Sequence, residues 1–139
     1  MKKKIKIHIR NNHWKEGFLP CDQEGEKHST ITKEEFEKGL NQYPEIKDKI
    51  EYLVDWDEDN YLSSMKEADV LLGWQFPTKN IREIAPNLKW IHIISAGVNH
   101  LSPFHWMKDK LVLTNSSGVH AKKAGEFGLM SILMLQNQM

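Results

Sequence analysis

The chain has 139 residues, 40% of them apolar, and this length and composition suit one domain with a buried core. Its 19 basic and 19 acidic side chains balance, so no overall field draws the chain to nucleic acid or to an anionic membrane. The single cysteine, Cys21, excludes an internal disulfide. The single cysteine and the lack of an apolar signal segment at the N-terminus together predict a cytoplasmic protein.

Five short segments have the apolar pattern of β-strands, and helical patterns separate them. The strands are expected at Lys4–Ile9, Glu51–Val54, Ala68–Trp74, Trp90–Ile94 and Leu111–Thr114. Alternation of strands and helices predicts an α/β fold with a parallel doubly wound sheet. Right-handed crossovers leave the flavodoxin-like strand order as the natural one for five strands.

The first helix has a clear start. Thr32 and Glu35 have the spacing of a capping box, and the buried stripe that follows is predicted to hold Phe36, Leu40 and Tyr43. Before it, the polar stretch Arg10 to Ser29 shows no periodicity, so it is either a surface insertion or a segment that covers a cleft.

Further helix signals lie between the later strands. Leu62 is expected on the inward face of one helix, beside Tyr61 and Met65. Thr78 is expected to cap the next helix. Ser102-Pro103 is expected to cap another, with proline at the first helical position.

The last segment does not suit a self-sufficient domain. From Ala121 to Leu135 the composition is helical, yet apolar side chains point to every side of the helix. It is too short to span a bilayer. Another domain or another copy of the chain is therefore expected to cover this helix, which predicts a homodimer or other self-association.

The loop Ser95-Ala96-Gly97-Val98 follows the apolar strand Trp90–Ile94. At the carboxyl end of a parallel strand, such small residues can present backbone N–H groups to an anion. One interpretation is that the loop holds a substrate carboxylate. The other is a tight turn whose glycine meets only a backbone requirement.

Signals for catalysis are few. There is no G-x-G-x-x-G motif after a strand, so no cofactor-binding residue is assigned. The seven histidines lack the spacing of a metal site, and no metal is expected. His8, His92 and His120 are predicted to be ordinary strand or loop residues rather than catalytic groups.

Two ordered motifs resemble a known family. The first runs from Leu88 to Leu101 and contains the small-residue loop; the second runs from Leu113 to Ala121 and continues in Ala124-Gly125-Glu126. Together they resemble the dehydrogenases specific for D-2-hydroxyacids, and within that group the glyoxylate and hydroxypyruvate reductases.

The resemblance implies a flavodoxin-like substrate domain over residues 1–119, followed at residues 120–139 by the first helix of a nucleotide-binding region. The amides of Ala96, Gly97 and Val98 would bind the substrate carboxylate, with Ser95 in the same loop. Trp74 and Asn99 are possible cleft residues, and Asn99 would support the loop.

The family's catalytic arginine, glutamate and histidine and its dinucleotide loop would all lie downstream of Met139. The resemblance therefore implies the first portion of an NAD- or NADP-dependent enzyme, which is expected to be inactive alone. The alternative is a non-catalytic module that binds a small carboxylate or associates through its final helix. The sequence does not distinguish NADH from NADPH, nor one 2-oxoacid from another.

Overall fold

The computed structural model describes residues 3–13, 27, 29–57 and 59–137. Its strands form one parallel sheet in the order β2-β1-β3-β4-β5, which is the flavodoxin-like order. The strands are β1 (Ile5–Asn11), β2 (Ile50–Trp56), β3 (Val70–Gly73), β4 (Trp90–Ile93) and β5 (Val112–Asn115). The predicted α/β fold is therefore confirmed, with strand ends shifted by one or two residues.

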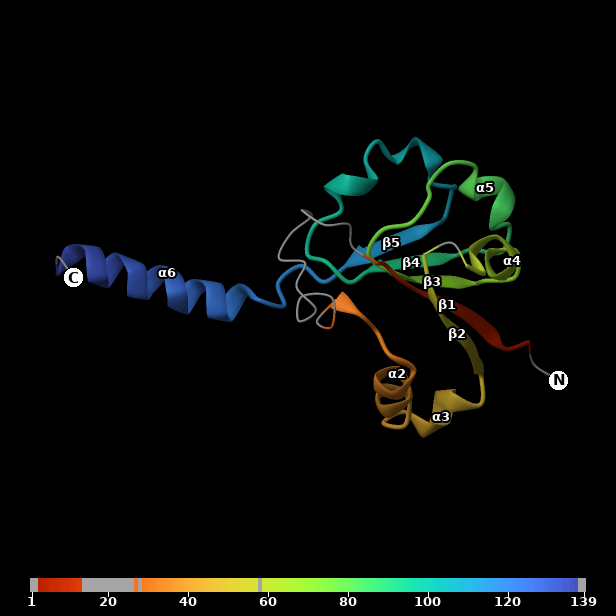
Figure 1. Ribbon diagram of the computed structural model, residues 1–139, viewed down its shortest axis with the longest axis horizontal. Helices are drawn as coiled ribbons and strands as arrows, with labels where there is room; N and C mark the ends of the chain where they lie inside the picture. The colour runs from red at the N-terminus through yellow and green to blue at the C-terminus, as the bar shows by residue number, and fades with distance from the viewer. Residues whose placement is uncertain (1–2, 14–26, 28, 58, 138–139) are drawn as a thin grey trace.

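Helices lie on both sides of this sheet (Figure 1). On one side are α4 (Tyr61–Met65), α5 (Ile81–Ile84) and the 3₁₀ turns η1 (Asn99–Leu101) and η2 (Phe104–Trp106). On the other side α2 (Lys33–Leu40) and α3 (Pro44–Lys47) lie near β2. The last helix, α6 (Ala121–Gln136), extends away from the sheet.

The main core lies between the sheet and the side that carries α4 and α5. Its fully buried members include Leu71 and Ile91 from the strands and Tyr61 and Met65 from α4. Gly73 brings β3 close to β1, because a Cβ at this position would lie 2.6 Å from the carbonyl oxygen of Arg10. Glycine is therefore required there for the two strands to pair.

The capping box of α2 forms as predicted. Thr32 Oγ1 accepts from the Glu35 amide at 3.1 Å, and the Glu35 carboxylate accepts from the Thr32 amide. The predicted stripe is wrong at Tyr43, which is 55% exposed, because the helix ends at Leu40 before its period reaches that residue. Phe36 instead packs on Tyr52, with ring centroids 4.7 Å apart.

Three other local predictions are wrong. Leu62 is 60% exposed, because α4 has only five residues and turns Tyr61 and Met65 to the core. Asn80, not Thr78, is the N-cap of α5. Ser102 and Pro103 do not start an α-helix; they separate two short 3₁₀ turns.

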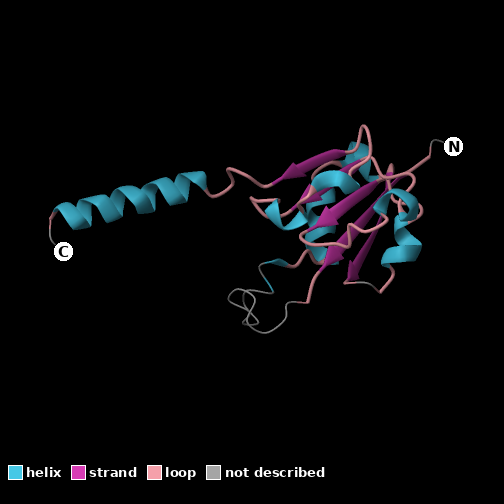
Figure 2. Cartoon of the chain, turned by 90° about the horizontal axis from the view of Figure 1, so that it is seen from above, coloured by secondary structure: helices cyan, strands magenta, loops and turns pink. Residues whose placement is uncertain are grey.

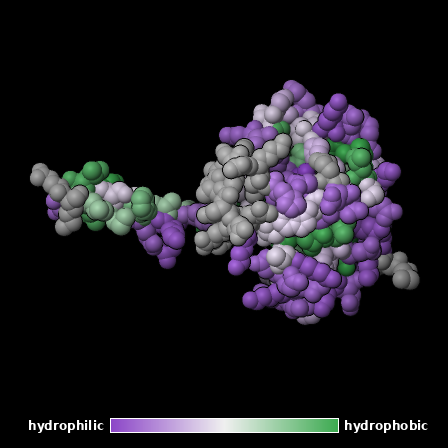
Figure 3. Space-filling model, in the orientation of Figure 1, coloured by the Kyte–Doolittle hydropathy of each residue, from purple (hydrophilic) through white to green (hydrophobic). Residues whose placement is uncertain are grey.

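Apolar side chains on α6 are exposed around the whole helix, as predicted from the composition. The large ones are between 44% and 79% exposed, and they are Phe127, Leu129, Met130, Ile132, Leu133, Met134 and Leu135. Figure 3 shows this arm as hydrophobic over most of its length. No described helix is long and apolar enough to cross a membrane.

Candidate functional site

The small-residue loop lies at the carboxyl end of β4 and is held on both sides. The Ile94 amide donates to the carbonyl of Gly73 on β3 at 3.0 Å, and the Ser116 amide donates to the carbonyl of Ser95, also at 3.0 Å. At the end of the loop, Val98 packs against the core. These anchors leave Ala96 and Gly97 exposed between two fixed ends.

The amides of this loop are open. None of the described residues accepts a hydrogen bond from the backbone N–H of Ala96, Gly97 or Val98. The carbonyl of Gly97, by contrast, accepts from Ser95 Oγ at 2.7 Å. Consecutive backbone N–H groups without acceptors can bind an anion where they point towards one position.

Gly97 bears on the two interpretations of the loop. Its φ is not in the left-handed region, and a Cβ built on it would meet no atom within 4 Å. Neither backbone conformation nor packing within the chain therefore requires glycine here. What the missing side chain leaves is open space at Gly97.

The possible cleft residues adjoin this loop. His100 Nε2 donates to the carbonyl of Trp74 at 2.9 Å, which ties the segment after β3 to η1, where Asn99 is the first residue. Trp74 is half-buried and Asn99 is exposed. The structure thus brings both residues to the same edge of the sheet as the loop.

A hydrogen-bond network lies behind the loop on β4 and β5. Thr114 Oγ1 accepts from Trp90 Nε1 at 2.8 Å and is 3.5 Å from the carbonyl of Ile91. When Thr114 Oγ1 donates its proton to that carbonyl, His92 Nδ1 donates to Thr114 Oγ1 at 2.9 Å. The other ring nitrogen of His92, Nε2, then accepts from Ser116 Oγ at 3.4 Å. The network holds Ser116, which in turn holds the loop.

Arg10 is a residue that the sequence reasoning missed, because it was placed in the polar stretch after the first strand. It lies in β1 and is only 6% exposed. Its Nε donates to the Asp57 carbonyl at 2.7 Å, its Nη1 donates to the Gln75 carbonyl, and its guanidinium lies 5.6 Å from the centre of the Tyr61 ring. Arg10 therefore fixes the segments that follow β2 and β3.

Acidic residues at the end of β2 also have structural partners. The Asp55 carboxylate accepts from the amides of Trp56 and Asn60, both at 2.9 Å. Asp57 Oδ2 lies 2.6 Å from His13 Nδ1, and the His13 ring stacks on Trp56 at 4.4 Å. In the part of the chain that the structure describes, no three His, Cys, Asp or Glu side chains could hold a metal ion.

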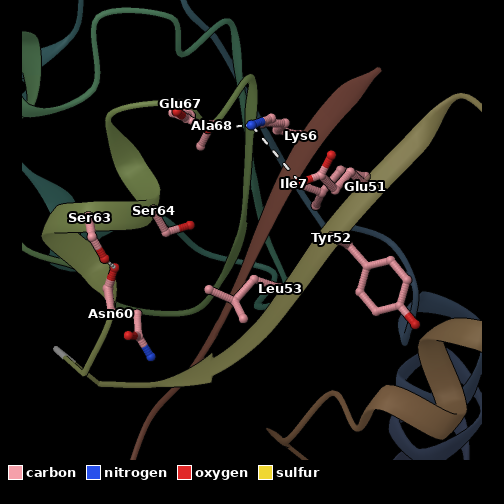
Figure 4. Close-up of a pocket in the computed structure, with 10 residues that line it drawn as sticks. All are labelled: Lys6, Ile7, Glu51, Tyr52, Leu53, Asn60, Ser63, Ser64, Glu67 and Ala68. Atoms are coloured by element: carbon pink, nitrogen blue, oxygen red, sulfur yellow. Dashed lines mark hydrogen bonds and ion pairs between the residues drawn. The ribbon is translucent and has the colours of Figure 1, made fainter. Parts of the chain in front are cut away.

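A pocket of about 470 Å³ lies away from the loop, between β1, β2 and α4 (Figure 4). Lys6 is one of the residues that line it, and its Nζ pairs with Glu67 and lies 4.0 Å from Glu51 Oε1. The hydrogen bond with Glu67 raises the pKa of Lys6 and lowers the pKa of Glu67. Since this cation is already paired with two carboxylates, the pocket offers no free charge to a substrate.

The described residues do not form a dinucleotide site. Gly125 and Gly128 lie inside α6 rather than in a turn after a strand. At the end of β3, Gly73 packs closely against the Arg10 backbone of the neighbouring strand.

Comparison with known proteins identifies the family. The family model described as "D-isomer specific 2-hydroxyacid dehydrogenase, catalytic domain" matches residues 27–131, which is more than half of the chain. No curated protein and no solved structure gives a match. The matched range includes the small-residue loop, four of the five strands and most of α6. The chain therefore belongs to the D-isomer specific 2-hydroxyacid dehydrogenase family, as part of its catalytic domain.

Proposed function

We propose that this chain is the substrate-binding domain of an NAD- or NADP-dependent reductase of a small 2-oxoacid, of the glyoxylate or hydroxypyruvate type. Its role is to hold the carboxylate of the substrate on the loop Ser95 to Val98. The observation that carries this proposal is the set of three open amides at Ala96, Gly97 and Val98, together with the open space at Gly97.

The chemistry of the loop supports an anion. Hydrogen bonds to a charged group contribute about 1.5–3 kcal/mol each, and they are stronger where water is excluded. Two or three amides therefore suffice for a weak but specific carboxylate site. Because no cationic side chain takes part, the loop favours a small planar carboxylate over a more highly charged phosphate.

In this proposal residues 1–119 form the substrate domain, and residues 120–139 begin the region that leads to the nucleotide-binding part. The cofactor and the groups that transfer hydride and proton are supplied from outside this chain. The isolated chain is accordingly expected to oxidise no NADH in the presence of glyoxylate. Measurable turnover by the pure chain would overturn this part of the proposal.

Carboxylate binding can be tested by titrating glyoxylate into the isotope-labelled chain and following backbone amide resonances. We expect shifts centred on Ala96, Gly97 and Val98, and none with glycolaldehyde, which lacks the carboxylate. If the amides of this loop do not move at tens of millimolar glyoxylate, the site assignment is wrong.

A pair of glycine variants sharpens the test. Gly97→Ala adds a methyl group to the open loop and is expected to weaken glyoxylate binding at least several-fold. Its thermal stability should not change, because the added methyl group meets no atom within 4 Å. Gly128→Ala on α6 also meets no atom within 4 Å and serves as the matched control, with unchanged binding.

We further propose that the chain self-associates through α6. Self-association is also compatible with the alternative function, a non-catalytic module that binds a small carboxylate. The exposure of seven large apolar side chains on this helix supports the proposal. Sedimentation of the wild-type chain and of Leu133→Lys tests it. A wild-type monomer at tens of micromolar would contradict self-association.

A further inference from the structure

The small-residue loop lies at the edge of the sheet where the parallel strands end, on the side from which α6 leaves (Figure 2). Its three open amides belong to consecutive peptide units that join Ser95, Ala96, Gly97 and Val98. A trans peptide unit is planar, so its N–H and its C=O point in opposite directions. The direction of each amide is therefore set by whatever holds the carbonyl of the preceding residue.

Two of these carbonyls are held. The carbonyl of Ser95 accepts from the Ser116 amide at 3.0 Å, which fixes the direction of the Ala96 N–H. The carbonyl of Gly97 accepts from Ser95 Oγ at 2.7 Å, which fixes the direction of the Val98 N–H. No backbone amide of the described residues donates to the carbonyl of Ala96, so the Gly97 N–H lacks such a hold. The loop thus has two oriented amides, and a carboxylate has two oxygen atoms that can accept from them.

The peptide unit between Gly97 and Val98 is the one that can turn over. Val98 is fixed on its far side, because its side chain packs on the core and its carbonyl accepts from the Leu101 amide at 3.0 Å. Gly97 has no Cβ to restrict rotation of the backbone, and a Cβ placed there would meet no atom within 4 Å. Turning this unit over would exchange the Val98 N–H for the Gly97 carbonyl oxygen, and that oxygen repels an anion.

The hydroxyl of Ser95 opposes this rotation. A carbonyl oxygen can only accept, so the hydroxyl must donate its single proton to Gly97. That proton is then not available to a substrate carboxylate. Ser95 is half-buried at the end of β4, and the bond from Ser116 to its own carbonyl holds its backbone in place. The side chain is therefore well placed to act on the loop rather than on the ligand.

We infer that Ser95 is a positioning residue of the carboxylate site. Its hydroxyl holds the peptide unit between Gly97 and Val98 in the orientation that offers the Val98 amide to the substrate. This inference rests on the proposed function of the loop and assigns the role of one side chain in it.

Titration of glyoxylate into isotope-labelled wild type, Ser95→Ala and Ser95→Thr tests the inference. Ser95→Ala is expected to bind about tenfold more weakly, the effect of losing one hydrogen bond to a charged group. The shift that glyoxylate causes at the Val98 amide should decrease most, whereas the Ala96 amide, oriented through Ser116, should still respond. Ser95→Thr keeps the hydroxyl and should restore most of the affinity.

A readout in the absence of glyoxylate separates positioning from a general loss of structure. In free Ser95→Ala the carbonyl carbon resonance of Gly97 should move, because its hydrogen-bond donor is gone, while the amide resonances of the strands stay in place. Ser117→Ala is the matched control. It removes the hydroxyl of an exposed serine that has no described side-chain partner, and it should leave binding unchanged.

The outcomes separate this inference from the proposed function. A wild-type chain that does not bind glyoxylate refutes both. If wild type binds and Ser95→Ala binds equally well, the carboxylate site stands and the role of Ser95 is wrong. An equal loss of response at Ala96 and Val98, with the Gly97 carbonyl resonance unmoved, would show that the hydroxyl contacts the substrate itself, and would also overturn the inference.

Discussion

His8 is expected to make the domain lose stability as the pH falls from 6.5 towards 4. Its side chain is fully buried in β1. Nδ1 lies 2.6 Å from Ser64 Oγ, and Nε2 is buried without a described partner. Burial, followed by the opposing effects of Asp55 and Arg10, lowers the pKa of His8 from 6.5 to about 4.

The sign of the effect follows from proton binding. Between pH 6.5 and pH 4 the unfolded chain protonates His8 while the folded chain does not, so protons favour unfolding. The stability contributed by the neutral imidazole is complete above pH 6.5 and is lost as the pH falls towards 4. At about 1.4 kcal/mol per pKa unit, the loss over this window reaches about 3 kcal/mol.

Urea unfolding at a series of pH values measures this loss, and His8→Asn is the control because its amide can still bond to Ser64. The wild-type midpoint should fall by about 1–2 M urea more than the variant midpoint across the window. Parallel pH profiles for wild type and variant would show that His8 already binds a proton in the folded state, and would refute the reasoning.

Three further variants test other contacts, each by urea or thermal unfolding. Gly73→Ala should cost about 1–3 kcal/mol, because its methyl group meets the Arg10 carbonyl; an unchanged midpoint would mean that β1 and β3 are not so close. Thr32→Ala should cost about 1 kcal/mol through loss of the capping box, and Thr32→Ser should restore most of it. Arg10→Met should cost at least about 2 kcal/mol, because it leaves two loop carbonyls without their donor; a loss below half of that would show that water replaces the guanidinium.

The strands and their order could be predicted from the sequence because the pattern is local and strong. Alternation in β1 and the apolar runs of β3 and β4 are visible without any tertiary information. Errors arose where periodicity was continued past a helix end. Tyr43 follows the end of α2, whereas Leu62 lies within a helix of five residues that turns Tyr61 and Met65 to the core instead.

The candidate loop was also visible, since Gly97 and its small neighbours follow a clear strand. The contacts that hold the surrounding segments in place could not be predicted, because they join residues that are far apart in the sequence. Arg10 contacts the carbonyl of Gln75, 65 positions away, and His92 contacts Thr114, 22 positions away. Single-sequence patterns carry no information about such pairs. The role of the loop in binding stays a prediction, which the glyoxylate titration tests.

The position of β1 in the sheet sets an order for folding. β3, β4 and β5 are joined by short connections; Lys89 and Asp69, whose side chains pair between β3 and β4, are 20 positions apart. By contrast, the Lys6 amide in β1 donates to the Asp69 carboxylate next to β3, and these two residues are 63 positions apart. Closing the longer loop costs more chain entropy. We therefore expect the amides of β4 and β5 to gain protection from hydrogen exchange first, and β1, though central in the finished sheet, to enter it late.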